Sequence, residues 1–109
     1  MITILQNDDF REGILLEARD GEEVLGTILC EIEADTLVIK EISSDRFLID
    51  GLCRAALNFA FNRFVNKCRF AGQKKEVMDE LIRLQFVQID NNLIDNIDNF
   101  FTLHKNCKK

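Results

Sequence analysis

The segment over residues 50–63 constrains the fold more than any other part of the chain. It reads DGLCRAALNFAFNR, with apolar residues on almost every side of a helix and one thin polar stripe formed by Arg54, Asn58 and Asn62. A helix at a protein surface needs only one apolar face. The segment therefore predicts a helix over about residues 52–65 that packs behind a sheet and is covered on more than one side.

The chain is long enough for one hydrophobic core and short for several domains. It has 109 residues, of which 47% are hydrophobic and 30% charged, and it contains no proline. These values are those of an ordinary globular domain. We expect residues 1–109 to form a single domain, and a homodimer is one arrangement that this size allows.

The charge distribution does not favour nucleic acid as a partner. The formal net charge is −5, and the basic residues are scattered except for Lys67, Arg69, Lys74 and Lys75. A nucleic-acid-binding protein normally shows a basic face with aromatic residues between the charges. The small basic cluster is either a solvated rim or a contact for a local anionic ligand.

The sequence shows neither a membrane span nor a secretion signal. No apolar run approaches the ~20 residues that cross a bilayer, and MITILQNDDF lacks the features of a signal peptide. We expect a cytosolic protein.

The cysteines do not form a metal-binding or disulfide pattern. Cys30, Cys53 and Cys68 are far apart in apolar surroundings, so we interpret them as core residues. His104 and Cys107 form an H-x-x-C pair, but two ligands do not make a metal site. We predict no metal, and Cys107 is the cysteine that we expect to be exposed.

The first half of the chain predicts an antiparallel meander. Residues 1–5 can form a short strand, and two apolar runs then flank Asp20-Gly21, a pair that accepts the positive φ angles of a tight hairpin. Ile28, Cys30 and Ile32 alternate with residues of the other face, as in a strand with one buried side. After a turn at residues 34–35, residues 36–42 predict a third strand of the meander.

The second half predicts a helical crossover, a second helix and further strands. We expect a loop over residues 43–50, then the long helix, then a strand within residues 67–72 beside residues 36–42. A second helix over 76–84 and strands over 86–89 and 99–104 complete the order βββ-α-β-α-β-β. The fold class is α+β, with a mixed, mainly antiparallel sheet and helices packed on its faces.

This order resembles the GNAT superfamily of acyl-CoA-dependent N-acetyltransferases over about residues 14–104. The family's loop motif, Gln/Arg-x-x-Gly-x-Gly/Ala before a leucine- and alanine-rich helix, falls on residues 48–53. Gly51 matches the motif, Cys53 is a small substitute, and Leu48 departs from it. The resemblance implies acetyl-CoA as the co-substrate and an unidentified small-molecule or peptide amine as the acceptor.

The resemblance places the phosphates of the cofactor at the start of the long helix. A helix N-terminus offers unpaired N–H groups, and a glycine lets a phosphate approach them. A turn that simply needs a glycine is the alternative explanation of Gly51, and a polar loop residue is the alternative for Gln73. The implied cofactor-binding residues are Ser43, Gly51, Leu52, Cys53, Arg54 and Gln73.

The implied catalytic residues are carboxylates. Glu41 and Glu31, on neighbouring strands, are the candidates for a general base. The family's tyrosine, which protonates the departing thiolate, is replaced by Leu81, and the chain contains no tyrosine. Solvent or another group would have to supply that proton.

The resemblance also departs at the N-terminus. Family members usually have a strand and two helices that wall the acceptor pocket, whereas only residues 1–13 precede the meander here. Either a second subunit closes the pocket or the acceptor site is missing. The alternative functions are a non-catalytic ligand-binding or dimeric interaction module and a structural subunit of a larger assembly.

Overall fold

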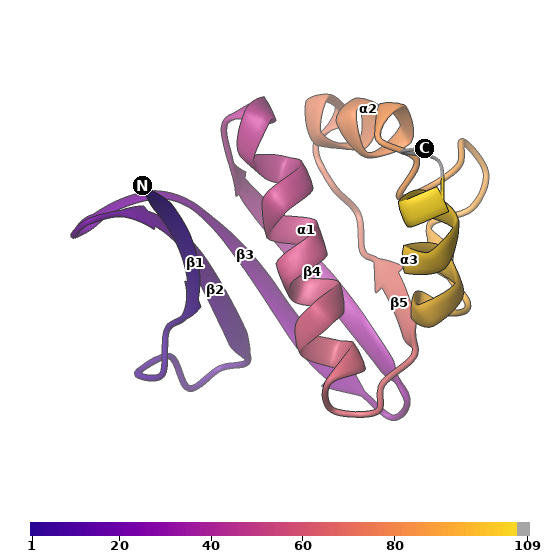
Figure 1. Ribbon diagram of the computed structural model, residues 1–109, viewed down its shortest axis with the longest axis horizontal. Coiled ribbons are helices and arrows are strands. Elements are labelled where there is room, and N and C mark those ends of the chain that lie inside the picture. Colours follow the sequence, from indigo (N-terminus) through magenta and orange to yellow (C-terminus); the bar gives the residue numbers. More distant parts are fainter. Residues whose placement is uncertain (107–109) are drawn as a thin grey trace.

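A six-stranded sheet with strand order β1-β2-β3-β4-β5-β6 forms the frame of the protein (Figure 1). The structure is a computed structural model that describes the backbone of residues 1–106 and the side chains of residues 1–102. The strands are β1 (Ile2–Gln6), β2 (Ile14–Asp20), β3 (Glu23–Glu33), β4 (Thr36–Ser44), β5 (Lys67–Phe70) and β6 (Leu93–Ile94). The helices are α1 (Arg46–Phe61), α2 (Lys75–Arg83) and α3 (Ile97–Asn106).

The predicted meander is confirmed. Strands β1 to β4 pair antiparallel in succession. Gly21 lies in the turn between β2 and β3 and has a φ angle of +64°. A glycine is favoured there because residues with a side chain are strained at this angle. Ile28 and Cys30 point into the core as expected, while Ile32, farther along β3, is 37% exposed.

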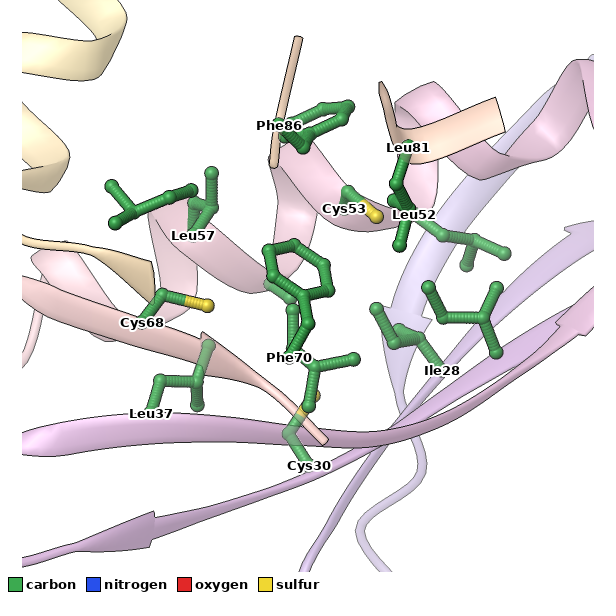
Figure 2. Packing of buried hydrophobic residues seen from close by; sticks show 14 of the residues in the cluster. Ile28, Cys30, Leu37, Leu52, Cys53, Leu57, Cys68, Phe70, Leu81 and Phe86 are labelled. Carbon is green, nitrogen blue, oxygen red and sulfur yellow. The ribbon is translucent and has the colours of Figure 1, made fainter. Parts of the chain in front are cut away.

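Helix α1 connects β4 to β5, which pairs parallel to β4, so the predicted crossover is also confirmed. The helix contacts β1 to β4 as well as α2 and α3. Figure 2 shows its Leu52, Cys53 and Leu57 among side chains of the sheet, such as Leu37, together with Phe86 from the segment after α2. This position between several elements explains why the helix is apolar on nearly every side.

The predicted start of this helix is wrong. Helix α1 begins at Arg46, so most of the expected loop over residues 43–50 is helical and Gly51 lies in the second turn. Leu48 and Ile49 are buried one turn before Leu52, which extends the apolar face toward the N-terminus. Gly51 is therefore not a helix start, because the apolar spacing continues through it.

Gly51 does have a packing neighbour. A Cβ atom built on Gly51 would lie 3.4 Å from Cδ1 of Ile4 on β1, at ordinary contact distance. The glycine therefore lies where α1 passes close to the first strand.

The two predicted C-terminal strands are also wrong. Residues 86–89 form a loop that buries Phe86 and Val87, and residues 99–104 lie in α3. This helix forms because its first N–H groups find acceptors: Asn66 accepts from two residues of the first turn, and Asn96 Oδ1 accepts from the Asn99 N–H at 2.9 Å. The side chain of His104 and all of Cys107 lie outside the described residues.

The Gly51→Ala variant should be more stable than the wild type. Alanine costs about 0.5–1 kcal/mol less than glycine inside a helix, and the new methyl group meets only the flexible end of Ile4. Gly21→Ala is the matched control and should lose about 1 kcal/mol, because its φ angle is left-handed. Urea unfolding of both variants measures the effect, and a destabilised Gly51→Ala protein would contradict this position of the helix.

Candidate functional site

Strands β4 and β5 separate partway along their length. They pair from Thr36 opposite Lys67 to Ile39 opposite Phe70. Beyond that point β4 continues over residues 40–44 beside β3, whereas the chain after Phe70 leaves toward α2. Within the described residues, no strand pairs with this edge of β4 after Ile39. The peptide groups that face this edge beyond Lys40 therefore lack a strand partner and can meet an extended ligand.

Gln73 holds the point where the strands separate. Its Nε2 donates hydrogen bonds to the carbonyl oxygens of Ile39 (3.3 Å), Lys40 (3.1 Å) and Ala71 (2.9 Å). The Ala71 N–H donates to the Ile39 carbonyl at 2.9 Å. The amide nitrogen of Gln73 is thus occupied by backbone carbonyls of both chain segments and fixes the angle between them.

Two pockets border the free edge of β4. One, of about 290 Å³, lies toward α1 and α2, and the other, of about 320 Å³, lies toward the β5–α2 connection. Both are lined by Glu41, Ile42 and Lys74, so they form one groove that crosses the edge of the strand. We call it the β4 groove; its remaining lining residues are Leu29, Lys40, Ser43, Ser44, Arg46, Ile49, Gly72, Gln73, Glu76 and Val77.

One end of the β4 groove reaches the N-terminus of α1. The first N–H groups of a helix lack carbonyl partners within the helix and carry partial positive charge. Asp45, the N-cap residue, makes no side-chain cap hydrogen bond. Arg46 and Lys74 add positive charges to this pocket, and Glu41 and Glu76 add negative ones. Ile49 and Val77 provide an apolar wall. This end can bind an anionic group that continues into an uncharged chain.

A buried carboxylate lies behind Arg46. Glu80 of α2 has a side chain only 3% exposed, and its Oε1 lies 3.2 Å from Nε of Arg46. Arg83, one turn along α2, donates to both carboxylate oxygens, with an Nε–Oε1 distance of 3.0 Å. Hydrogen bonding to Arg83, more than the nearby charge of Arg46, holds the pKa of Glu80 below its usual range.

The structure brings together only part of the predicted cofactor site. Ser43 and Gln73 line the β4 groove. Leu52 and Cys53 are fully buried in the core, where burial raises the pKa of the Cys53 thiol. Neither residue offers a surface to a ligand in this structure.

Gly51 and Arg54 lie on α1 outside the β4 groove. Gly51 is exposed on the helix beside Ile4. The Arg54 guanidinium bonds Asp50 one turn earlier, with an Nε–Oδ1 distance of 3.0 Å. The prediction that the helix begins at about Leu52, directly after Gly51, is therefore wrong. Sequence reasoning missed Ser44, Arg46 and Glu80. The apolar spacing back to Leu48 could have indicated Arg46 as the helix start, but Glu80 lies on another helix and no local signal points to it.

The two predicted general bases have different surroundings. Glu41 lines both pockets of the β4 groove. Glu31 faces Lys40, with its Oε1 at 2.9 Å from Nζ. A hydrogen bond with Glu33, followed by the one from Lys40, lowers the pKa of Glu31. Glu41 is the better placed of the two, because it lines the β4 groove while the Glu31 carboxylate is paired with Lys40.

The described residues contain neither a metal-binding cluster nor a membrane-spanning helix. In the part of the chain that the structure describes, no three His, Cys, Asp or Glu side chains are grouped so that they could hold a metal ion. None of the described helices combines the length and the apolar character needed to cross a bilayer.

A solved structure has a similar fold. The PaiA N-acetyltransferase from Thermoplasma acidophilum, crystallised in complex with coenzyme A, superposes with a TM-score of 0.55 at 14% sequence identity. The match covers 67% of this chain and 49% of the other, so it spans about half the length of that enzyme. The likeness shows a GNAT-like fold, as the sequence predicts.

Comparisons of sequence alone add no relative. A scan against models of protein families finds no match, and neither does a search of curated proteins.

Replacing Gln73 with Glu should open the point where β4 and β5 separate. The change removes the NH₂ donor and sets a carboxylate against three carbonyl oxygens, so we expect a loss of about 1–3 kcal/mol in the free energy of unfolding. Gln88→Glu, on an exposed loop residue, is the matched control and should stay within about 0.5 kcal/mol of the wild type. Urea unfolding at pH 7 compares them, and equal stabilities would show that Gln73 does not hold the strands.

Proposed function

We propose that the chain is an acyl-CoA-dependent N-acetyltransferase that transfers acetyl from acetyl-CoA to a small-molecule or peptide amine. The observation that carries the proposal is the β4 groove, in which a free strand edge leads to the positive end of a helix. The similar fold of an N-acetyltransferase crystallised with coenzyme A supports it. Fold likeness alone does not establish activity, so the groove chemistry carries the argument.

The β4 groove suits the chemical parts of acetyl-CoA. The negatively charged diphosphate fits the N-terminus of α1, with Arg46 and Lys74 beside it. The pantetheine arm contains amides, which match the peptide groups of residues 41–44 that face away from β3, and its methylene groups match the apolar wall. Ser43 and Gly72 belong to the same lining.

The observed helix start also changes how the loop motif falls on the chain. Counted from Arg46, the pattern Gln/Arg-x-x-Gly-x-Gly/Ala has its arginine at Arg46 and its last glycine at Gly51. Ile49 then stands where the middle glycine is expected and is buried against the core. In this register Arg46 replaces Arg54 as the proposed phosphate contact.

The proposed transfer needs one base and one source of protons. Acetyl-CoA supplies an acetyl group activated as a thioester, so the amine nitrogen bonds to the carbonyl carbon while the carbon–sulfur bond breaks and the sulfur leaves as a thiolate. Glu41, in the β4 groove, takes a proton from the amine. With Leu81 in the core at the tyrosine position, solvent within the groove protonates the thiolate.

We also propose that residues 1–109 form a single domain and that the protein acts in the cytosol. A second copy of the chain would close the side of the site at which the acceptor amine binds. In a homodimer, residues of the second copy would form a wall of the acceptor pocket.

A non-catalytic acyl-CoA-binding module is the second candidate function. The buried Leu81 favours it, because this side chain cannot donate a proton. Both functions require acetyl-CoA to bind in the β4 groove, but only the N-acetyltransferase would transfer the acetyl group to an amine.

The first test measures binding of acetyl-CoA by calorimetry and release of CoA by chromatography with a panel of amines. The Glu41→Gln variant should keep its affinity and lose about 10²–10⁴ in kcat/KM, as expected for removal of a general base. Glu22→Gln, in the β2–β3 turn, is the control and should act as the wild type. Binding without turnover for every amine would favour the module, and absence of binding would reject both functions.

A further inference from the structure

Arg46, at the start of α1, forms a charged cluster with Glu80 and Arg83, near the end of α2. Arg46 also lines the β4 groove. We propose that Glu80 is a positioning residue that holds Arg46 in place for the diphosphate of an acyl-CoA. This inference rests on the function proposed above and deepens its cofactor site.

The geometry leaves Arg46 ready for a second partner. Its Nε lies 3.2 Å from Oε1 of Glu80, while the side chain as a whole is 76% exposed and lines the β4 groove. Among the described residues, Glu80 is its one ion-pair or hydrogen-bond partner. Guanidinium binds planar pairs of anionic oxygens through two N–H groups, so the terminal Nη groups can contact a phosphate while Nε stays on Glu80.

The charge balance of the cluster supports the same role. Arg83 already satisfies both oxygens of the Glu80 carboxylate. Arg46 is therefore a second cation on one anion, and the three side chains together keep one formal positive charge. Asp50 lies near Arg83, and Glu76 lines the same pocket as Arg46. The attraction for an anion is therefore local to the exposed Arg46 guanidinium beside the N-terminus of α1.

Burial explains why the carboxylate orients Arg46. The Glu80 side chain is 3% exposed on α2, which packs against α1, so its position is fixed by the core on one side. A free arginine side chain loses rotamer freedom when it binds a ligand. Arg46 loses part of that freedom to Glu80 before the ligand arrives, which is how a supporting residue strengthens a binding site.

The experiment compares two probes by calorimetry: acetyl-CoA, and S-acetylpantetheine, which lacks the diphosphate and the nucleotide. The Glu80→Gln variant should bind acetyl-CoA about tenfold more weakly, equal to about 1.4 kcal/mol. Its affinity for S-acetylpantetheine should change less than about twofold, because this probe has no diphosphate for Arg46 to contact. A general loss of the fold would instead weaken the binding of both probes. Asp79→Asn, on the exposed pair with Lys75 of the same helix, is the matched control.

Arg46 variants complete the design. Arg46→Ala should show the same selective loss, and adding Glu80→Gln to it should weaken acetyl-CoA binding no further, since both act through one guanidinium. Should Glu80→Gln fail to fold, Arg46→Lys still tests the inference, because this exposed side chain keeps its charge but loses the Nε contact. It should lose affinity for acetyl-CoA and keep affinity for S-acetylpantetheine.

Three results would overturn the inference while leaving the proposed function standing. They are unchanged binding of acetyl-CoA, equal losses for both probes, and tighter binding of acetyl-CoA, which would mean that Glu80 competes with phosphate for Arg46. A wild type that binds neither probe would overturn the proposed function, and the inference with it.

Discussion

The burial of α1 between the sheet and two other helices is the constraint on which the rest of the structure depends. Side chains such as Leu52 and Leu57 have no exposed surface, and each buried leucine contributes about 1.5–3 kcal/mol. Because the helix must also connect β4 to a parallel β5, it passes across the sheet and contacts β1 to β4 (Figure 1). The apolar residues on nearly every side of α1 are thus a consequence of this crossover.

The same crossover creates the β4 groove. Strand β5, which follows the helix, is shorter than β4, and its pairing with β4 stops at Ile39 opposite Phe70. Gln73 holds the two segments at the end of that pairing, while α1 begins directly beyond the free edge of β4. The core therefore determines where a strand edge and a helix N-terminus meet, and charged residues such as Arg46 give that place its preference for anions.

The sequence predicted the elements whose signals are local. Alternation and the Asp20-Gly21 turn identified the meander, and repeated apolar spacing identified α2. It failed where tertiary contacts decide: Asn66 supplies acceptors to the start of α3 from a distant part of the chain, which no local pattern reveals. Of the predicted site residues, Ser43, Glu41 and Gln73 line the β4 groove, whereas the expected helix start at Gly51 left Arg46 out of the prediction. Glu80 was missed because only packing of α2 on α1 brings it there.

The most direct test of the central claim is amide hydrogen–deuterium exchange with and without acetyl-CoA. The free edge of β4 and the start of α1 should both contact the ligand if the β4 groove is the cofactor site. We predict slower exchange in residues 40–48 and in the β5–α2 connection on addition of acetyl-CoA, with β1 and β2 unchanged. Unchanged exchange in residues 40–48, or protection confined to another part of the chain, would contradict the account.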